Sequence, residues 1–135
     1  MTTVKVNYLG GLRTECTHVK SGVKLVTDAP VDNNGKGESF SPTDLLATSY
    51  ASCMMTIIGI YCESNQLNFV NGSANILKVM GSDPRRVSAL EIKFDLTGNG
   101  WSEAEQNKVR RAAEACPVAK SVSENMQIVL NYQFV

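Results

Sequence analysis

A chain of 135 residues is long enough to bury a core but short of two ordinary domains, so a single domain over residues 1–135 is expected. Its 13 basic and 13 acidic residues give a formal net charge of zero, which removes the electrostatic basis for binding nucleic acid or an anionic membrane. The first residues lack the basic and apolar regions of a signal peptide, so a cytoplasmic location is expected. In that compartment the four cysteines, Cys16, Cys53, Cys62 and Cys116, are expected to be free thiols.

The N-terminal part of the chain alternates between apolar and polar residues in a way that predicts three strands. The strands cover 4–9, 12–19 and 23–27, with tight turns at Gly10-Gly11 and Ser21-Gly22. The segment 30–40 that follows is rich in Gly and Asn and is expected to be a loop. This part of the chain therefore predicts an antiparallel meander that ends in a long connection.

A long helix is predicted to begin after Ser41. Ser41 suits the N-cap, Pro42 suits the first helical position, and Asp44 completes a capping box. The run 45–62 carries no charge and is long enough to cross a bilayer. Hydroxyl groups and a glycine dilute its apolar character, at Thr48, Ser49, Ser52, Thr56 and Gly59. The run is therefore interpreted as the central helix of a protein core, with no membrane partner.

The second half of the chain combines further strands with one more helix. Strands are predicted at 73–80, 88–97 and 127–134, with a turn at Asp83-Pro84 between the first two and the strictest alternation in the second. A helix is predicted from Ser102, whose capping-box partner is Glu105, to the break before Pro117. Pro117 can then open a new helical turn with Cys116 as its N-cap.

Two of the cysteines occupy positions that could support chemistry. Cys53 and Cys62 fall on opposite sides of the first helix, roughly 13 Å apart along its axis, so these two cannot pair within one chain. Cys53 lies about three turns inside that helix, where a thiolate needs a cation from elsewhere because the helix dipole barely reaches it. Cys116 stands at a helix N-terminus, which favours a thiolate directly. These positions leave open whether Cys53 or Cys116 would attack a substrate.

The remaining candidates have structural interpretations. Cys16 and Cys62 are interpreted as small hydrophobic residues, the usual role of an unpaired cysteine. The single histidine, His18, is expected at the surface of a strand, so a Ser-His-Asp triad has no support. The Cys and His spacings do not match a zinc site, and no metal or other cofactor is expected.

Three motifs stand out along the chain: YLGGLR at 8–13, SPTDLLATSYASC at 41–53 and AAEACPVAKSVS at 112–123. Together they resemble the OsmC/Ohr family, the osmotically inducible and organic hydroperoxide resistance proteins. The second motif is the most specific of the three, and its combination with the Ala-Cys-Pro sequence of the third carries the resemblance. The resemblance extends over essentially the full length.

The resemblance implies an α+β fold, with curved antiparallel sheets around the two central helices of an intertwined homodimer. It also implies a cysteine-based peroxidase of oxidative stress defence, which reduces organic hydroperoxides and is restored by a dithiol. By the same resemblance, Cys53 is the peroxidatic thiolate, Cys116 is the resolving thiol, and Arg13 is the cation that favours the thiolate and orients the peroxide. An apolar site around Cys53 would bind a fatty or aryl hydroperoxide by burial.

One position departs from the pattern of the hydroperoxide resistance branch. The glutamate that pairs with the arginine in that branch is replaced by Thr43. Glu38 and Asp44 are candidates to substitute, although Asp44 is already engaged in the capping box. The chain is therefore interpreted as a member of an OsmC-like branch with two functions open. One is the thiol-dependent peroxidase, and the alternative is a non-enzymatic stress protein that binds an apolar ligand or senses oxidation through the same cysteines.

Overall fold

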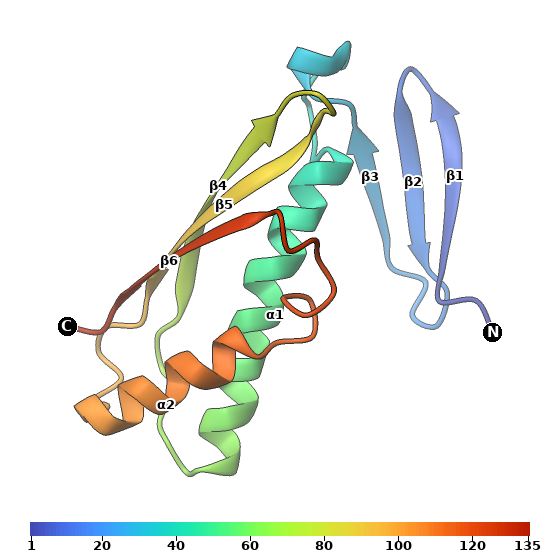
Figure 1. Ribbon diagram of the computed structural model, residues 1–135. Helices are drawn as coiled ribbons and strands as arrows, with labels where there is room; N and C mark the ends of the chain where they lie inside the picture. The colour runs from blue at the N-terminus through green and yellow to red at the C-terminus, as the bar shows by residue number, and fades with distance from the viewer. The chain divides into compact units, whose positions relative to one another are not determined.

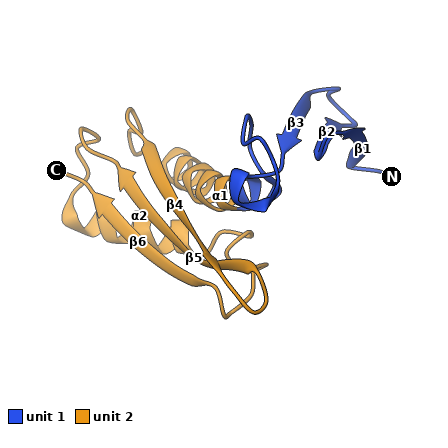
Figure 2. Ribbon diagram, turned by 90° about the horizontal axis from the view of Figure 1, so that it is seen from above, with its two compact units in different colours: residues 1–46 blue, residues 47–135 orange.

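The computed structural model describes residues 1–135, which form helices and strands in the order shown in Figure 1. Two compact units divide the chain, residues 1–46 and residues 47–135 (Figure 2). The first unit contains β1 (Val4–Gly10), β2 (Arg13–His18), β3 (Lys24–Asp28) and a 3-10 turn, η1 (Val31–Asn33). Helix α1 (Pro42–Ser64) begins in the last residues of this unit and lies mainly in the second. The second unit also contains β4 (Ser73–Gly81), β5 (Arg86–Asp95), α2 (Glu103–Glu114) and β6 (Gln127–Gln133).

The first unit is the antiparallel meander that the sequence predicts, with strand order β1-β2-β3. Its first turn explains the Gly10-Gly11 pair, because the backbone passes through positive φ values of 85° and 62° at these two residues. Such values favour glycine, since other L-residues meet a steric penalty there. The register that follows places Arg13, the first residue of β2, directly opposite Asp28, the last residue of β3.

The connection from β3 to α1 folds back alongside β3. The backbone N–H of Asp28 donates to the carbonyl of Phe40 at 3.0 Å, and the Ser39 hydroxyl donates to the carbonyl of Val26 at 2.8 Å. The predicted loop over 30–40 is confirmed, with η1 as its one regular turn. These bonds hold the last residues of the loop beside the end of β3.

Helix α1 begins with the predicted capping box. The Ser41 backbone N–H donates to Asp44 Oδ2 at 2.9 Å, and the Asp44 N–H donates to Ser41 Oγ at 3.0 Å. The helix runs two residues beyond the predicted end, to Ser64. By length and composition alone it would also be able to cross a membrane, with a mean hydropathy of 1.5 in its most apolar window. Core helices of soluble proteins meet the same criterion.

The second unit has one layer of sheet and one of helix. Strand β5 alternates strictly, with Leu90, Ile92 and Phe94 buried and the residues between them exposed. Helices α1 and α2 cover the buried face, and both contribute side chains to the same core (Figure 2). From α1 the buried side chains are Ala47, Tyr50, Ala51, Met54, Ile58 and Cys62, and from α2 they are Val109 and Ala113.

Helix α2 also begins with its predicted capping box, formed by Ser102 and Glu105. The expectation of antiparallel sheets needs one correction in this unit. Strands β4 and β5 form an antiparallel hairpin, but β6 runs parallel to β5. The connection from β5 to β6 contains α2, and a crossover of this length returns the chain to the starting edge of the sheet, so that the next strand runs in the same direction.

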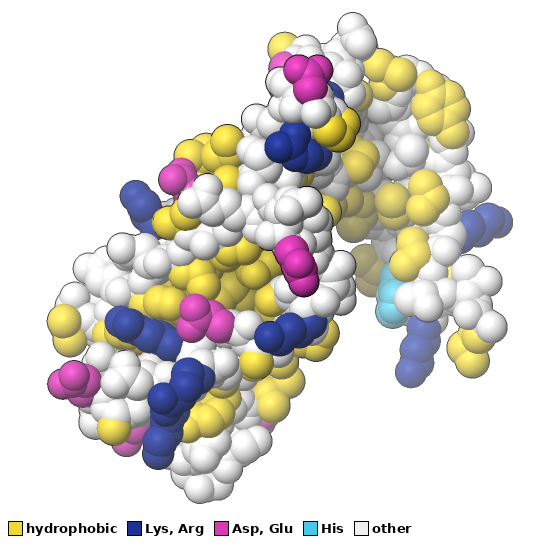
Figure 3. Space-filling model, viewed as in Figure 1, with side chains coloured by type: hydrophobic (Ala, Val, Ile, Leu, Met, Phe, Trp, Pro, Cys, Tyr) yellow, Lys and Arg dark blue, Asp and Glu magenta, His cyan; other side chains and the backbone are white.

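Apolar side chains remain exposed on the sheet of the first unit. The exposed fractions of Val6 and Tyr8 are 60% and 68%. Figure 3 shows apolar side chains at the surface of this sheet, at the right of the view. A meander of three strands ordinarily needs a packed face to be stable. The exposed apolar side chains of this sheet are therefore relevant to how the protein assembles.

Candidate active site

The candidate residues fall into two groups. Cys53 and Cys116 belong to the second unit, whereas Arg13, Glu38 and Asp44 belong to the first. Each group forms its own arrangement of contacts.

The two thiols of the second unit are neighbours. Cys53 projects from the middle of α1, is half-buried, and packs against the core. Cys116 follows the end of α2 and is fully buried, with 0% of its surface exposed. The Cys53 side chain lies close enough to Cys116 to raise the pKa of its thiol, and both are free thiols. Two neighbouring free thiols can be joined as a disulfide when a two-electron oxidant is present.

A helical turn holds Cys116 in place, as the Ala-Cys-Pro sequence predicts. The Ala119 backbone N–H donates to Cys116 Sγ at 3.4 Å, and the Lys120 N–H donates to the Cys116 carbonyl at 3.3 Å. Cys116 therefore acts as the N-cap of the turn that Pro117 opens.

The expectation that this position favours a thiolate is wrong in sign. Burial raises the pKa of the Cys116 thiol, and the bond from Ala119 opposes this without reversing it. The Cys53 side chain raises the same pKa further, through a hydrogen bond and its charge. Because loss of water disfavours the charged form, Cys116 is held as a protonated thiol at neutral pH.

Two tyrosines lie close enough to Cys116 for ionisation of its thiol to raise their pKa values. Burial raises the pKa of Tyr50 on α1, and charge on Cys116 and Glu114 adds to the increase. The pKa of Tyr132 on β6 is raised strongly, by burial first and by Glu114 next. The Tyr132 hydroxyl is buried without a hydrogen-bond partner, while its ring stacks on Phe94 with centroids 5.2 Å apart. Both phenols therefore stay neutral beside the thiols.

Of the other two cysteines, Cys62 packs in the core as the sequence-based interpretation expects. Cys62 is buried in the core, and burial raises the pKa of its thiol. Cys16 lies in the middle of β2, with its sulfur 3.9 Å from the Thr14 hydroxyl. Neither contact assigns a reaction to these thiols.

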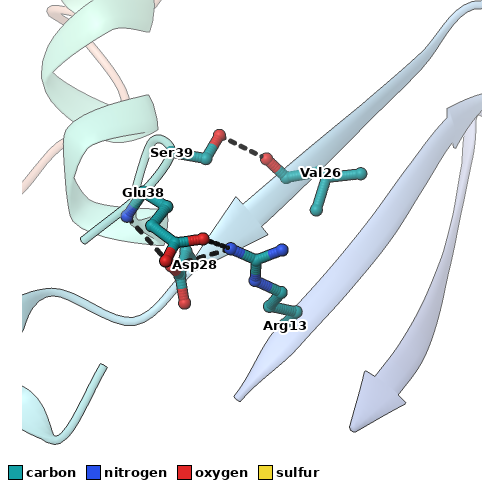
Figure 4. Close-up of polar contacts among 5 residues, drawn as sticks. All are labelled: Arg13, Val26, Asp28, Glu38 and Ser39. Atoms are coloured by element: carbon teal, nitrogen blue, oxygen red, sulfur yellow. Dashed lines mark hydrogen bonds and ion pairs between the residues drawn. The ribbon is translucent and has the colours of Figure 1, made fainter. Parts of the chain in front are cut away.

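Arg13 is held by two carboxylates in the first unit (Figure 4). Its Nη2 lies 2.5 Å from Glu38 Oε2 and 3.4 Å from Asp28 Oδ2. The Glu38 backbone N–H also donates to Asp28 Oδ2, at 3.0 Å. The carboxylates raise the pKa of the guanidinium, and the hydrogen bond that Arg13 donates to Asp28 makes the largest contribution. Glu38 is one of the two partners that the sequence proposes for Arg13.

Asp28 is the residue of this cluster that sequence reasoning misses. The predicted third strand ends at residue 27, whereas β3 includes Asp28. Extending the predicted hairpin by one residue pair would have found it, because the register around Ser21-Gly22 places Asp28 opposite Arg13. A charged pair directly across two antiparallel strands is a favourable combination.

Asp44, the other proposed partner, binds elsewhere. Its Oδ2 accepts the Ser41 N–H in the capping box, as described above. Within the first unit the hydrogen bonds of Arg13 go to Asp28 and Glu38. The carboxylate that Thr43 cannot supply is thus replaced by two that come from the end of β3 and from the loop after it.

An open hollow of about 360 Å³ lies between α1 and β4. Its lining is mixed, with hydroxyl groups from Thr48, Ser52 and Thr56 and apolar atoms from Met55 and Ile76 among its members. Cys53 does not line this hollow, because the next residue along a helix points about 100° away from Ser52. The hollow is therefore separate from the thiol pair.

The fold and these contacts define a class of small α+β protein that carries a pair of neighbouring thiols on its central helix and after its second helix. The OsmC-like protein family model matches residues 35–131, which include both cysteines, and the chain belongs to this family. The resemblance inferred from the three sequence motifs is confirmed.

Known proteins resemble the chain over nearly its whole length. An organic hydroperoxide resistance protein-like protein of Staphylococcus aureus is 27% identical over 116 residues, which are 84% of this chain and 80% of that protein. A crystal structure from Psychrobacter arcticus 273-4, described as a candidate osmotic stress induced and detoxification response protein, is 46% identical with a TM-score of 0.93 and covers 98% of this chain and 96% of its own. An organic hydroperoxide resistance protein OsmC from Legionella pneumophila is 19% identical with a TM-score of 0.74 over 98% of each chain, a likeness that shows the fold.

Proposed function

We propose that the chain is a thiol-dependent peroxidase that reduces organic hydroperoxides, with Cys53 as the peroxidatic residue and Cys116 as the resolving residue. The proximity of two free thiols of unequal exposure supports this most directly. A peroxide that arrives from solvent meets the half-buried Cys53 before the fully buried Cys116. The name of the Staphylococcus aureus relative supports the same class of substrate.

The chemistry balances with a dithiol as the reductant. The Cys53 thiolate attacks the terminal peroxide oxygen of ROOH and breaks the O–O bond, which gives Cys53 sulfenic acid and, after protonation, the alcohol ROH. The Cys116 thiol then attacks the sulfenic sulfur, and a disulfide forms as water leaves. A dithiol restores both thiols and is itself oxidised to a disulfide, which completes a two-electron cycle.

Arg13 supplies the positive charge in this proposal. Cys53 lies too far inside α1 to be helped by the helix dipole, so its thiolate requires a cation from another part of the assembly. We propose that this assembly is a homodimer and that it is located in the cytoplasm. The ion pairs with Asp28 and Glu38 support this role for Arg13, because an ordered guanidinium can present fixed donors to an oxygen or sulfur anion.

The non-enzymatic alternative loses its main support in the first unit. It drew on Thr43, which cannot pair with an arginine as a glutamate would. Asp28 and Glu38 supply carboxylates to Arg13. The absence of a glutamate at position 43 is therefore no longer an argument against an ordered guanidinium in a peroxidase.

Consumption of cumene hydroperoxide in the presence of dithiothreitol tests the proposal. The wild type should consume cumene hydroperoxide faster than hydrogen peroxide, and Cys53→Ser should abolish the reaction. Cys62→Ser is the matched control. It removes a thiol from the same helix, but this thiol lies in the core and is not part of the thiol pair. A wild type that binds hydroperoxide without consuming it would overturn the peroxidase assignment and favour the alternative.

A further inference from the structure

The two carboxylates that hold Arg13 differ in how they are fixed. Asp28 belongs to β3 and faces Arg13 through the register of the sheet. Glu38 belongs to the loop before α1 and reaches Arg13 with its side chain. The position of Asp28 is thus set by strand pairing, whereas the position of Glu38 depends on a loop.

They differ equally in burial. The exposed fraction of the side chain is 0% for Asp28, 35% for Arg13 and 60% for Glu38. An ion pair with an exposed carboxylate is screened by water and contributes little, whereas a buried charge must keep its partner. Asp28 is therefore the partner that Arg13 cannot exchange without cost.

The two oxygens of the Asp28 carboxylate differ in their hydrogen bonds. Its Oδ2 accepts both Arg13 Nη2 and the Glu38 backbone N–H, but its Oδ1 is buried without a hydrogen-bond partner. A buried acceptor left without a partner is costly and calls for an explanation. The cost is understandable if the charge of Asp28 serves to hold the guanidinium.

The contacts use only one nitrogen of the guanidinium. Both carboxylates bind Nη2, and within the first unit Nη1 and Nε make no hydrogen bond. A guanidinium carries five N–H donors in a rigid plane. Fixing the plane at Nη2 leaves three donors, two on Nη1 and one on Nε, in a defined orientation.

The geometry points to Asp28 as the residue that positions Arg13 and to Glu38 as an exchangeable second partner, with the Nη1 and Nε donors left for the peroxide. This role rests on the peroxidase function proposed above. Asp28 acts through Arg13 and touches no reacting atom, so it is a positioning residue.

Side-chain NMR of the guanidinium reads this role without any need for activity. In an anchored guanidinium the two Nη groups rotate slowly and give separate signals, whereas in a free one they average. With the Arg13 signals assigned through Arg13→Lys in the full-length protein, the wild type and Glu38→Gln should both give separate Nη signals. Asp28→Asn, which keeps the shape and removes the charge, should give averaged signals.

The rate of Cys53 oxidation by cumene hydroperoxide provides the second readout. Asp28→Asn should slow it roughly tenfold to a hundredfold, the usual effect of losing a residue that orients a functional group. Glu38→Gln should slow it no more than about fivefold, as expected for an exposed ion pair. Glu15→Gln is the matched control, because it breaks the Glu15–Lys24 ion pair of the same sheet, and it should leave the rate unchanged.

Averaged Arg13 signals in Glu38→Gln, or separate signals in Asp28→Asn, would overturn the assignment. If Asp28→Asn does not fold, the Glu38→Gln spectrum decides alone, with separate signals in support and averaged signals against. If the wild type shows no peroxidase activity, the proposed function fails, and loss of the separate signals in Asp28→Asn alone would still support Asp28 as the anchor of Arg13.

Discussion

Burial distinguishes the two neighbouring thiols and supports the roles proposed for them. The pKa of Cys116 is raised because its thiol is removed from water, so the protonated form prevails at neutral pH. A thiolate is the nucleophile in peroxide reduction, and a buried, protonated thiol reacts slowly with peroxide. This supports the proposed role of Cys116, which is to attack a sulfenic acid on Cys53 and not to react with the substrate itself.

Loss of Cys116 should change the fate of oxidised Cys53. Peroxide treatment of the wild type should give an intramolecular Cys53–Cys116 disulfide, and Cys116→Ser should accumulate sulfenic, sulfinic and sulfonic acids on Cys53, since no thiol is left to condense with the first of these. Peptide mapping by mass spectrometry distinguishes the products. Cys62→Ser should form the wild-type disulfide, and a dominant bridge to Cys16 or Cys62 would contradict the assignment.

Asp28 should make stability depend on pH at the acid end. The Glu38 backbone N–H holds the pKa of Asp28 below its usual value, and Arg13 adds to this, although burial acts in the opposite direction. Because the folded-state pKa is lower than the unfolded one, the stabilisation is complete above the unfolded value of about 3.9 and is lost as pH falls through the folded value.

Urea unfolding of the wild type and Asp28→Asn at a series of pH values measures this contribution. Asp28→Asn should have a lower free energy of unfolding than the wild type at pH 7, and the difference should shrink as the pH falls below about 4. A difference that stays constant down to the lowest pH would mean that the ionisation of Asp28 contributes nothing to folding.

At the scale of elements, the sequence predicts those features of helices and strands that depend on residues close together in the chain. The capping boxes at Ser41 and Ser102 lie within four residues, so the sequence locates both helix starts. The strict alternation over 88–97 likewise locates β5 and its buried face. The parallel direction of β6 could not be read in the same way, because it depends on how the crossover through α2 packs against the sheet.

The candidate site shows the same division. The motifs identify Cys53, Cys116 and Arg13, but the carboxylate opposite Arg13 comes from strand register. Asp28 lies 15 residues from Arg13 in the chain. Because the predicted third strand ends one residue too early, it leaves out the residue that pairs with Arg13. The expectation of a favoured thiolate at Cys116 fails for a related reason. The position of Cys116 at a helix terminus can be read from nearby residues, but the burial that raises its pKa depends on the whole core.

The buried face of β5 should account for much of the stability of the second unit. Ile92 is 1% exposed in the centre of the core, so Ile92→Ala should lower the free energy of unfolding by about 2–5 kcal/mol, through lost burial and the cavity left behind. Lys93→Ala, on the exposed face of the same strand, is the control and should change stability by less than about 0.5 kcal/mol. Urea unfolding measures both, and equal losses would mean that the two faces of β5 are not packed differently.

At the scale of the whole molecule, one face of the N-terminal sheet presents an apolar stripe across all three strands. The register aligns Val6 of β1 with Cys16 of β2 and Cys16 with Leu25 of β3. Val6 is 60% exposed and Leu25 is 44% exposed. Contiguous apolar surface on a soluble chain ordinarily marks a site of association, and a sheet of three strands gains stability from a covered face. We propose that the occupant is a second copy of the chain, as the family resemblance implies.

The wild type should therefore be an obligate homodimer in which a partner covers this stripe. Val6→Lys should weaken association, because it places a charge where an apolar contact is needed, and the protein should dissociate or unfold at concentrations where the wild type remains dimeric. Asn7→Lys is the matched control, since successive residues of a strand point to opposite faces, and it should remain dimeric. Light scattering over a dilution series measures the mass of each variant. A wild type that stays folded as a monomer at micromolar concentration would contradict the obligate dimer, and equal dissociation of both variants would mean that the other face of the sheet is also buried in it.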